Sequence, residues 1–172
     1  MNNIPEKINA FNVYLSGSML IGLSEEVALP SFEGITETVS GPGLLGEFES
    51  AALGHFSSME MEIPFRQMDE EIFKLADQSA ALDLTLRGSI QFTDGATGAT
   101  GFKPMRVVVR GKNKSFEGGS AKQGNGTKSK IKVEILYILI EVNNKSMVEL
   151  DKLNFVFKVN GKDLMEKVRR MC

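Results

Sequence analysis

The residue types that could do chemistry gather first between positions 119 and 129, where GSAKQGNGTKS sets glycines beside lysines. A phosphate-binding loop needs a glycine, four residues and then Gly-Lys-Ser/Thr, so that backbone N–H groups wrap the phosphates and the lysine reaches their outer oxygens. Counted from Gly119, the second glycine falls at Gly124, but Asn125 then stands where the lysine belongs. The stretch that follows, KIKVEILYILIEV, predicts a strand rather than the helix that such a loop requires. The pattern therefore disfavours a nucleotide site.

Two glutamates and the single histidine are the other candidates for chemistry. Glu60 and Glu62 alternate with apolar residues, so they should point to one face of a strand about 7 Å apart, where they could hold a cation or act as an acid pair. His55 has no serine or cysteine pattern around it that would indicate a nucleophilic triad. A zinc site would need more His and Cys ligands than the chain possesses. We expect ordinary polar-face glutamates, no metal, no other cofactor and no catalysis.

Charge is segregated along the chain. Residues 33–71 hold nine acids and one base, and residues 110–132 hold seven bases and one acid. The two segments are interpreted either as solvated strand faces or as surfaces through which neighbouring copies meet. The basic segment could also bind phosphate backbones, but only Phe116 is interleaved with its lysines, so the stacking platform of a single-strand binder is missing.

The totals narrow the class of protein. A chain of 172 residues with 42% hydrophobic and 24% charged residues is long enough for one domain with a full core, and a net charge of −2 does not fit a globally basic nucleic-acid binder. The longest apolar run, 135–140, is too short to span a bilayer, and the N-terminus lacks the pattern of a signal peptide, so we expect no membrane anchor. Cys172 is the only cysteine, which favours an intracellular origin.

Turn signals divide the sequence into short extended runs. Strands are predicted at 11–15, 19–23, 34–40, 55–65, 81–92, 105–116, 130–142 and 147–159, a helix at 69–78 capped by Asp69, and a short helix within 162–171. The fold class is therefore mainly β (α+β): an antiparallel sandwich or partly closed barrel with one flanking helix and a short C-terminal helix.

The segment 41–54, GPGLLGEFESAALG, is predicted to be a long loop because its glycines and proline break regular structure. It nevertheless carries Leu44, Leu45, Phe48 and Leu53. A loop with that many apolar side chains either folds back on its own domain or is covered by another subunit, and the sequence leaves both alternatives open.

Several segments, read in order, resemble one family. They are NVYLSG (12–17), Leu29-Pro30, GPGLLG (41–46), RGKNK (110–114), KQGNGTKSKIKV (122–133), Glu149-x-Asp151-x-x-Asn154, VNGKD (159–163), Glu166 and Arg169-Arg170. The chain resembles the major tail tube proteins of contractile, P2-like bacteriophages and of R-type contractile bacteriocins. The middle, from about 54 to 104, matches mainly in pattern.

The resemblance implies a structural protein without enzymatic activity, located in a virion tail or bacteriocin particle and made in the cytoplasm of a bacterial host. Its copies would form hexameric rings that stack helically into a hollow tube inside a contractile sheath. The implied partners are the protein itself, the tail sheath protein, a baseplate or tube initiator, the tape-measure protein, and DNA that passes through the lumen without sequence-specific binding. In a bacteriocin the tube would pierce the target envelope.

From these observations we expect two interface segments, a loop at about 41–54 and a basic hairpin at about 110–132, within a single domain of residues 1–172. The residues expected at oligomer interfaces are Gly41, Gly43, Leu44, Leu45, Gly46, Phe48, Arg110, Lys112, Lys114, Lys122, Gln123, Lys128 and Lys130. Glu60 and Glu62 are expected on the lumen wall. The rival hypotheses are a basic-hairpin nucleic-acid-binding β-barrel module and a small barrel that binds an apolar ligand.

Overall fold

The computed structural model describes residues 3–23 and 26–172, and most of them form antiparallel strands. The strands are β1 (Asn3–Leu15), β2 (Ser18–Met19), β3 (Gly34–Val39), β4 (Phe48–Phe56), β5 (Glu60–Pro64), β6 (Leu82–Asp94), β7 (Thr100–Glu117), β8 (Lys130–Val142), β9 (Lys145–Asp151), β10 (Val156–Val159) and β11 (Lys162–Asp163). The helices are α1 (Glu70–Phe73) and α2 (Glu166–Arg169). This confirms the predicted mainly β class and the short C-terminal helix.

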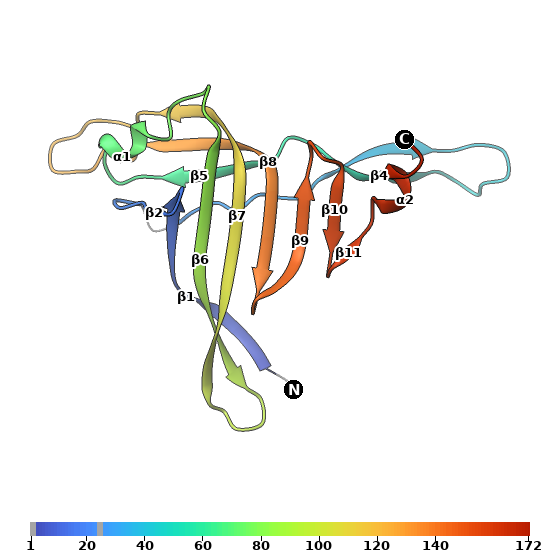
Figure 1. Ribbon diagram of the computed structural model, residues 1–172, viewed down its shortest axis with the longest axis horizontal. Coiled ribbons are helices and arrows are strands. Elements are labelled where there is room, and N and C mark those ends of the chain that lie inside the picture. The colour runs from blue at the N-terminus through green and yellow to red at the C-terminus, as the bar shows by residue number, and fades with distance from the viewer. Residues whose placement is uncertain (1–2, 24–25) are drawn as a thin grey trace.

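The main sheet folds over itself because β7 and β8 bend. Its order is β11-β10-β9-β8-β7-β6-β1-β2, and β5 pairs with the first half of β8 while β9 pairs with the second half (Figure 1). The bend lies at a bulge between Arg110 and Gly111 of β7. A Cβ at Gly111 would lie 1.9 Å from the backbone oxygen of Glu134, so only glycine fits there. The result is two packed layers that do not close into a barrel.

The core lies between these layers and is built by alternation along the strands. Met59, Met61, Ile63 and Phe65 are all buried, as the period-2 pattern of their segment predicts. The strands β1, β6, β7, β8 and β9 of the facing layer contribute further buried side chains to the same cluster: Val13, Leu84, Leu86, Val107, Val109, Ile138 and Leu150. The interior is therefore filled by side chains, which disfavours a barrel with an internal ligand cavity.

The helix predicted at 69–78 is wrong in length. Asp69 does cap it, since its carboxylate accepts from the backbone N–H of Glu70 at 2.7 Å. The helix ends after one turn, however, and the chain continues in tight turns with bonds from Leu75 N to Ile72 O and from Ala76 N to Phe73 O. The buried side chain of Asn113 then donates to the backbone oxygen of Leu75 at 2.7 Å, which takes an acceptor that a longer helix would use.

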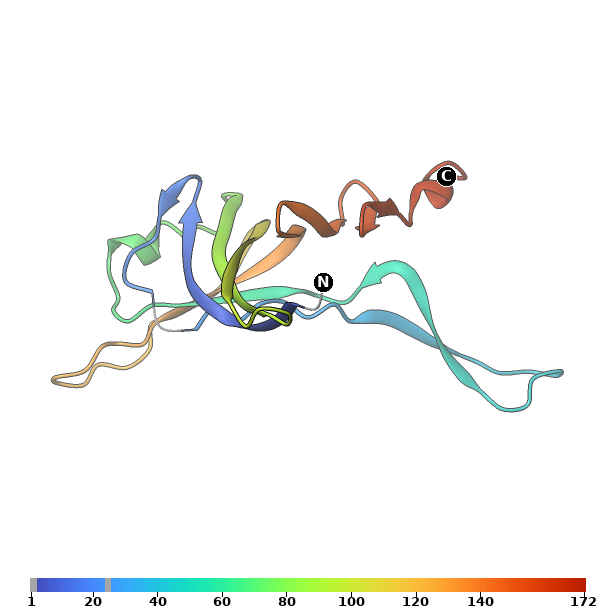
Figure 2. The same ribbon diagram turned by 90° about the horizontal axis from the view of Figure 1, so that it is seen from below.

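The loop predicted at 41–54 is wrong in its second half. Residues 48–54 belong to β4, which pairs with β3 in a separate two-stranded sheet in which Val39 opposes Phe48 and Glu37 opposes Ser50. Only residues 40–47 connect the strands. This hairpin, called the arm below (residues 34–56), extends away from the two layers (Figure 2).

No helix among the described residues is long and apolar enough to cross a membrane.

The packed layers predict a clear difference between two isoleucines. Ile63 is fully buried and Ile21 is 70% exposed. Ile63→Ala should lower the free energy of unfolding by about 2–5 kcal/mol, because it removes buried methyl groups and leaves a cavity. Ile21→Ala should change it by less than about 0.5 kcal/mol. Urea unfolding measures both values, and equal effects would contradict the assigned core.

Candidate functional site

The arm is an acidic hairpin that its own chain leaves uncovered. It has no lysine or arginine, and Glu33 at its root is followed by Glu37, Glu47 and Glu49 within it. Its exposed apolar residues are Ile35, Val39, Leu44, Leu45, Phe48 and Leu53. Nine residues of β4 extend it by about 30 Å. An isolated two-stranded hairpin is marginally stable in water, and a contiguous apolar patch of this kind marks an interaction site.

The residues of segment 41–48 that the sequence analysis expected at an interface lie at the tip of the arm, far from the core. Gly43 and Gly46 have φ angles of 92° and 114°, which only glycine adopts without strain. The backbone N–H of Leu44 donates to the oxygen of Gly41 at 3.2 Å, and Leu45 is completely exposed. The turn thus presents a bare leucine side chain to solvent.

The lysine-rich loop at 118–129 lies at the other end of the molecule's long axis (Figure 2). Its glycines serve close packing of backbone against backbone: a Cβ at Gly119 would lie 1.9 Å from the oxygen of Thr127, and one at Gly126 would lie 2.2 Å from the oxygen of Arg66. The Thr127 hydroxyl accepts from the backbone N–H of Met68 at 2.8 Å. The glycines therefore allow close packing that shapes and anchors this loop, and they are not part of a phosphate-binding motif.

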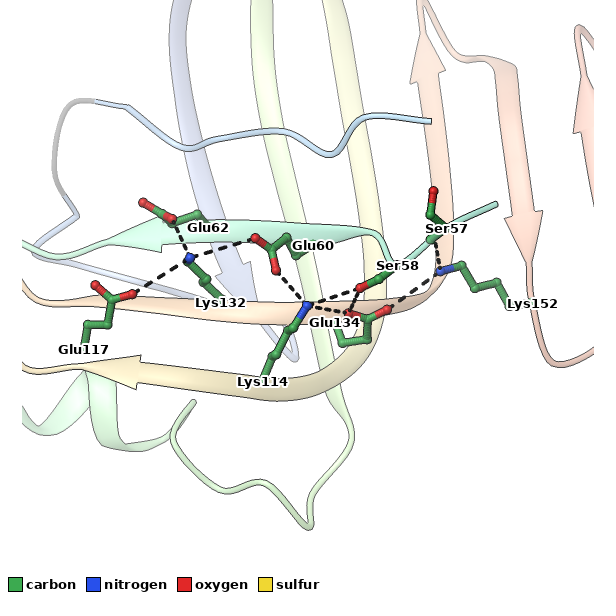
Figure 3. Close-up of polar contacts among 9 residues, drawn as sticks. All are labelled: Ser57, Ser58, Glu60, Glu62, Lys114, Glu117, Lys132, Glu134 and Lys152. Carbon is green, nitrogen blue, oxygen red and sulfur yellow. Dashed lines mark hydrogen bonds and ion pairs between the residues drawn. The ribbon is translucent and has the colours of Figure 1, made fainter. Parts of the chain in front are cut away.

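A network of ion pairs crosses β5, β8 and the end of β7, and Figure 3 shows its members apart from Lys130. The ammonium of Lys114 lies 3.0 Å from Glu60 and 3.5 Å from Glu134. Lys114 also donates to the hydroxyl of Ser58 at 3.2 Å, and that hydroxyl donates to Glu134 at 2.7 Å. Lys152 reaches Glu134 from β9's end at 3.9 Å. This half of the network ties the segment just after the arm to the body.

The other half of the network holds Glu62. Lys130 lies 3.4 Å from Glu62 and 3.4 Å from Glu117, while Lys132 lies 3.9 Å from each of Glu60, Glu62 and Glu117. The four lysines and four glutamates of the whole network balance one another. The hydrogen bond from Lys114 lowers the pKa of Glu60 and raises that of Lys114.

The structure thus brings together residues that the sequence assigned to different roles. Lys114 and Lys130, expected at an interface, contact the expected lumen residues Glu60 and Glu62 within one chain. A signal was present, because the alternating acids of EMEIP (60–64) complement the alternating lysines of KIK (130–132), and Glu62 does oppose Lys132. Neutralised lysines also weaken the nucleic-acid-binding hypothesis.

The remaining predicted basic residues lie apart from this network. The guanidinium of Arg110 stacks 4.1 Å above the ring centroid of Tyr137. Lys112, Lys122, Gln123 and Lys128 are exposed, and so is Arg66 beside the loop. No group of three or more His, Cys, Asp or Glu residues that could hold a metal occurs in the described part of the chain.

Comparison with known proteins decides what this combination of an arm and a two-layer sheet belongs to. The family model described as phage tail tube protein FII matches residues 5–171. The chain belongs to this tail tube family. It is 33% identical over 170 residues to the tail tube protein of Escherichia phage P2, covering 97% of this chain and 96% of that protein. It is 29% identical over 161 residues to the major tail tube protein of Serratia phage KSP20, covering 94% and 91%.

A solved structure supports the tail tube fold. A chain of an extracellular contractile injection system, described as its sheath/tube terminator in the extended state, matches 80% of this chain and 96% of its own length with a TM-score of 0.57 and 14% sequence identity. The tail tube family is structural and is not a known enzyme family.

The pair of Glu60 with Lys114 predicts a pH dependence of stability. Because the folded-state pKa of Glu60 lies below its unfolded value near 4.5, the pair stabilises the fold above that value, and this contribution is lost as pH falls through the folded pKa. Glu60→Gln should therefore show a smaller fall in urea midpoint between neutral and acidic pH than the unaltered chain. Glu47→Gln, at the arm tip, is the control and should leave the fall unchanged; equal curves for Glu60→Gln would contradict the pairing.

Proposed function

We propose that this protein is the building block of an inner tail tube, in which hexameric rings stack helically inside a contractile sheath. The polymerising unit is the single domain of residues 1–172. The observation that carries the proposal is the acidic, apolar arm, which has the composition of an interface although residues 35–53 stay exposed in its own chain. A head-to-tail contact that closes forms a ring, and one that repeats along an axis forms a filament.

The arm and the lysine-rich loop are a matched pair for such a contact. The arm is acidic, and the loop at the opposite end of the long axis carries Lys122 and Lys128, with Arg66 beside it. Complementary surfaces at opposite ends cannot meet within one molecule, but they can join successive copies. We therefore assign Gly41–Phe48 and the loop lysines to contacts between subunits, with Gln123 at the loop's tip.

The intrachain ion pairs change the charge that Glu60 and Glu62 would present on the lumen wall. With Glu60 and Glu62 on the lumen wall, that wall presents carboxylates that lysines of the same chain already neutralise. Such a surface neither holds nor strongly repels DNA, which suits a conduit. A tube structure with both carboxylates on the sheath side would refute this placement.

The tube has two possible settings, a phage tail that conducts DNA or a bacteriocin particle whose tube pierces an envelope. In both, the further partners are the sheath, a baseplate or tube initiator and, in a phage, the tape-measure protein. The similarity to tail tube proteins of two phages supports the phage setting. Synthesis in the bacterial cytoplasm follows from either.

Removing the apolar arm tip should prevent assembly without unfolding the monomer. Leu45→Asp replaces a fully exposed leucine, so its effect on the free energy of unfolding should be below about 0.5 kcal/mol. In the tube the same change would bury an unpaired charge, so rings and rods should disappear from negative-stain micrographs. Ile21→Asp, an exposed isoleucine outside the arm, is the control. Normal tubes from Leu45→Asp would contradict the assigned interface.

Charge reversal tests the partner of the arm. Lys122 and Lys128 have no ion-pair partner among the described residues, whereas Lys130 does, so the variant Lys122→Glu/Lys128→Glu spares the intrachain network. Assembly should be lost because acid then meets acid, and adding Glu47→Lys/Glu49→Lys in the same chain should restore it. Tube yield measured by sedimentation separates the variants. Failure of the second pair to restore any assembly would show that the arm and the loop are not partners.

A further inference from the structure

The C-terminal part of the chain carries several motif residues that neither the arm nor the lysine-rich loop explains. Asp163 accepts from the backbone N–H of Met165 at 3.0 Å and from Nη2 of Arg169 at 2.6 Å. Nη1 of Arg169 donates to the backbone oxygen of Phe155 at 2.8 Å. One guanidinium therefore joins α2 both to the turn before β10 and to the segment before the helix.

The side chain of Met165 connects this C-terminal arrangement to the arm. Its side chain is 3% exposed and packs against Gly54, where a Cβ would lie 2.5 Å from the methionine sulfur. Gly54 has a φ angle of 75°, so both its backbone conformation and the sulfur contact require glycine. In Figure 1, α2 overlaps β4 in projection, and the contact of Met165, the residue before α2, with Gly54 joins the two segments. The arm and the C-terminal helix thus interlock at one point.

Aromatic contacts reinforce the contact between Met165 and Gly54. Phe56 of β4 meets Phe157 of β10 edge to face, with ring centroids 5.1 Å apart, and His55 meets Phe155 at 6.0 Å. Phe155 has a φ angle of 58°, a strained conformation for a bulky residue. The carboxylate of Asp151 holds that turn by accepting from the backbone N–H groups of Leu153 and Asn154, each at 3.0 Å. Backbone strain that the surrounding contacts maintain in this way marks Phe155 as a candidate functional position.

We propose that the C-terminal segment 162–169 is a clasp that fixes the direction of the arm, with Arg169 as its positioning residue. Contacts nearer the body, such as Ser57 N to Glu33 O at 2.9 Å, fasten the arm's base. The clasp acts further out, at Gly54, and there it sets the direction of the remaining part of the arm, whose β4 strand reaches about 20 Å beyond Gly54. The task of the clasp rests on the proposed function, in which the arm engages the next copy.

The expected size of the effect follows from the fraction of molecules whose arm is correctly directed. If loss of the clasp leaves that fraction at about one tenth, the protein concentration needed for assembly rises about tenfold. The substitution Arg169→Met removes both guanidinium contacts. Arg170→Met is the matched control, because Arg170 is exposed and, among the described residues, its guanidinium pairs only with Glu166 on its own helix.

Single-molecule energy transfer measures arm direction in the full chain at dilutions where no tube forms. Dyes are attached at Glu47→Cys, at the arm tip, and Lys145→Cys, on the body, with Cys172→Ser as background. Arg169→Met should broaden the transfer distribution and raise the assembly concentration, and Arg170→Met should change neither. Should Arg169→Met fail to fold by circular dichroism, Met165→Ala keeps the Asp163–Arg169 pair and is expected to give the same two changes.

An unchanged narrow distribution in a folded clasp variant would overturn the proposal. A broad distribution with unchanged assembly would overturn the clasp's role in assembly, provided that Leu45→Asp blocks tubes. If Leu45→Asp assembles normally, the arm interface of the proposed function has failed instead, and the energy-transfer result alone still decides whether the clasp directs the arm.

Discussion

An apolar hairpin whose outer part, residues 35–53, stays exposed in its own chain is the constraint on which the rest of this structure depends. A two-stranded ribbon lacks a hydrophobic face packed on a core, and both of its edges leave backbone groups without strand partners. The arm can be fully stabilised only by contacts from outside the chain. In the proposed tube this deficit is used, because the free energy withheld from the monomer becomes available when copies meet.

The two-layer body supplies the rigid support that such an arm needs. The bend at Gly111 lets β7 and β8 run through both layers, so the core side chains of one layer pack directly on those of the other. The ion-pair network then fastens the segment that follows the arm, through Ser58 and Glu134, to the outer side of β8. Exposed ion pairs contribute little stability individually, but a network of this size fixes geometry at modest entropic cost.

Local patterns predicted the parts of the structure that depend on neighbouring residues. The alternation from Met59 to Phe65 identified a buried strand face, and Asp69 identified a helix start. The length of α1 could not be predicted, because the Asn113 side chain that takes the Leu75 oxygen is distant in sequence. The strand character of 48–54 was hidden because Ser50, Ala51 and Ala52 have weak β propensity. Which lysine meets which glutamate depends on the pairing register of β5 with β8, another long-range property.

The central claim is that the arm of one copy packs on another copy. A cryo-EM reconstruction of assembled tubes tests it most directly, because it places residues 34–56 relative to every neighbouring subunit. The account predicts density for the whole arm against an adjacent copy, with Leu45 buried and the arm's glutamates beside the lysines of the 118–129 loop. An arm that projects into solvent, or that folds back onto its own β-layers in the tube, would contradict the account.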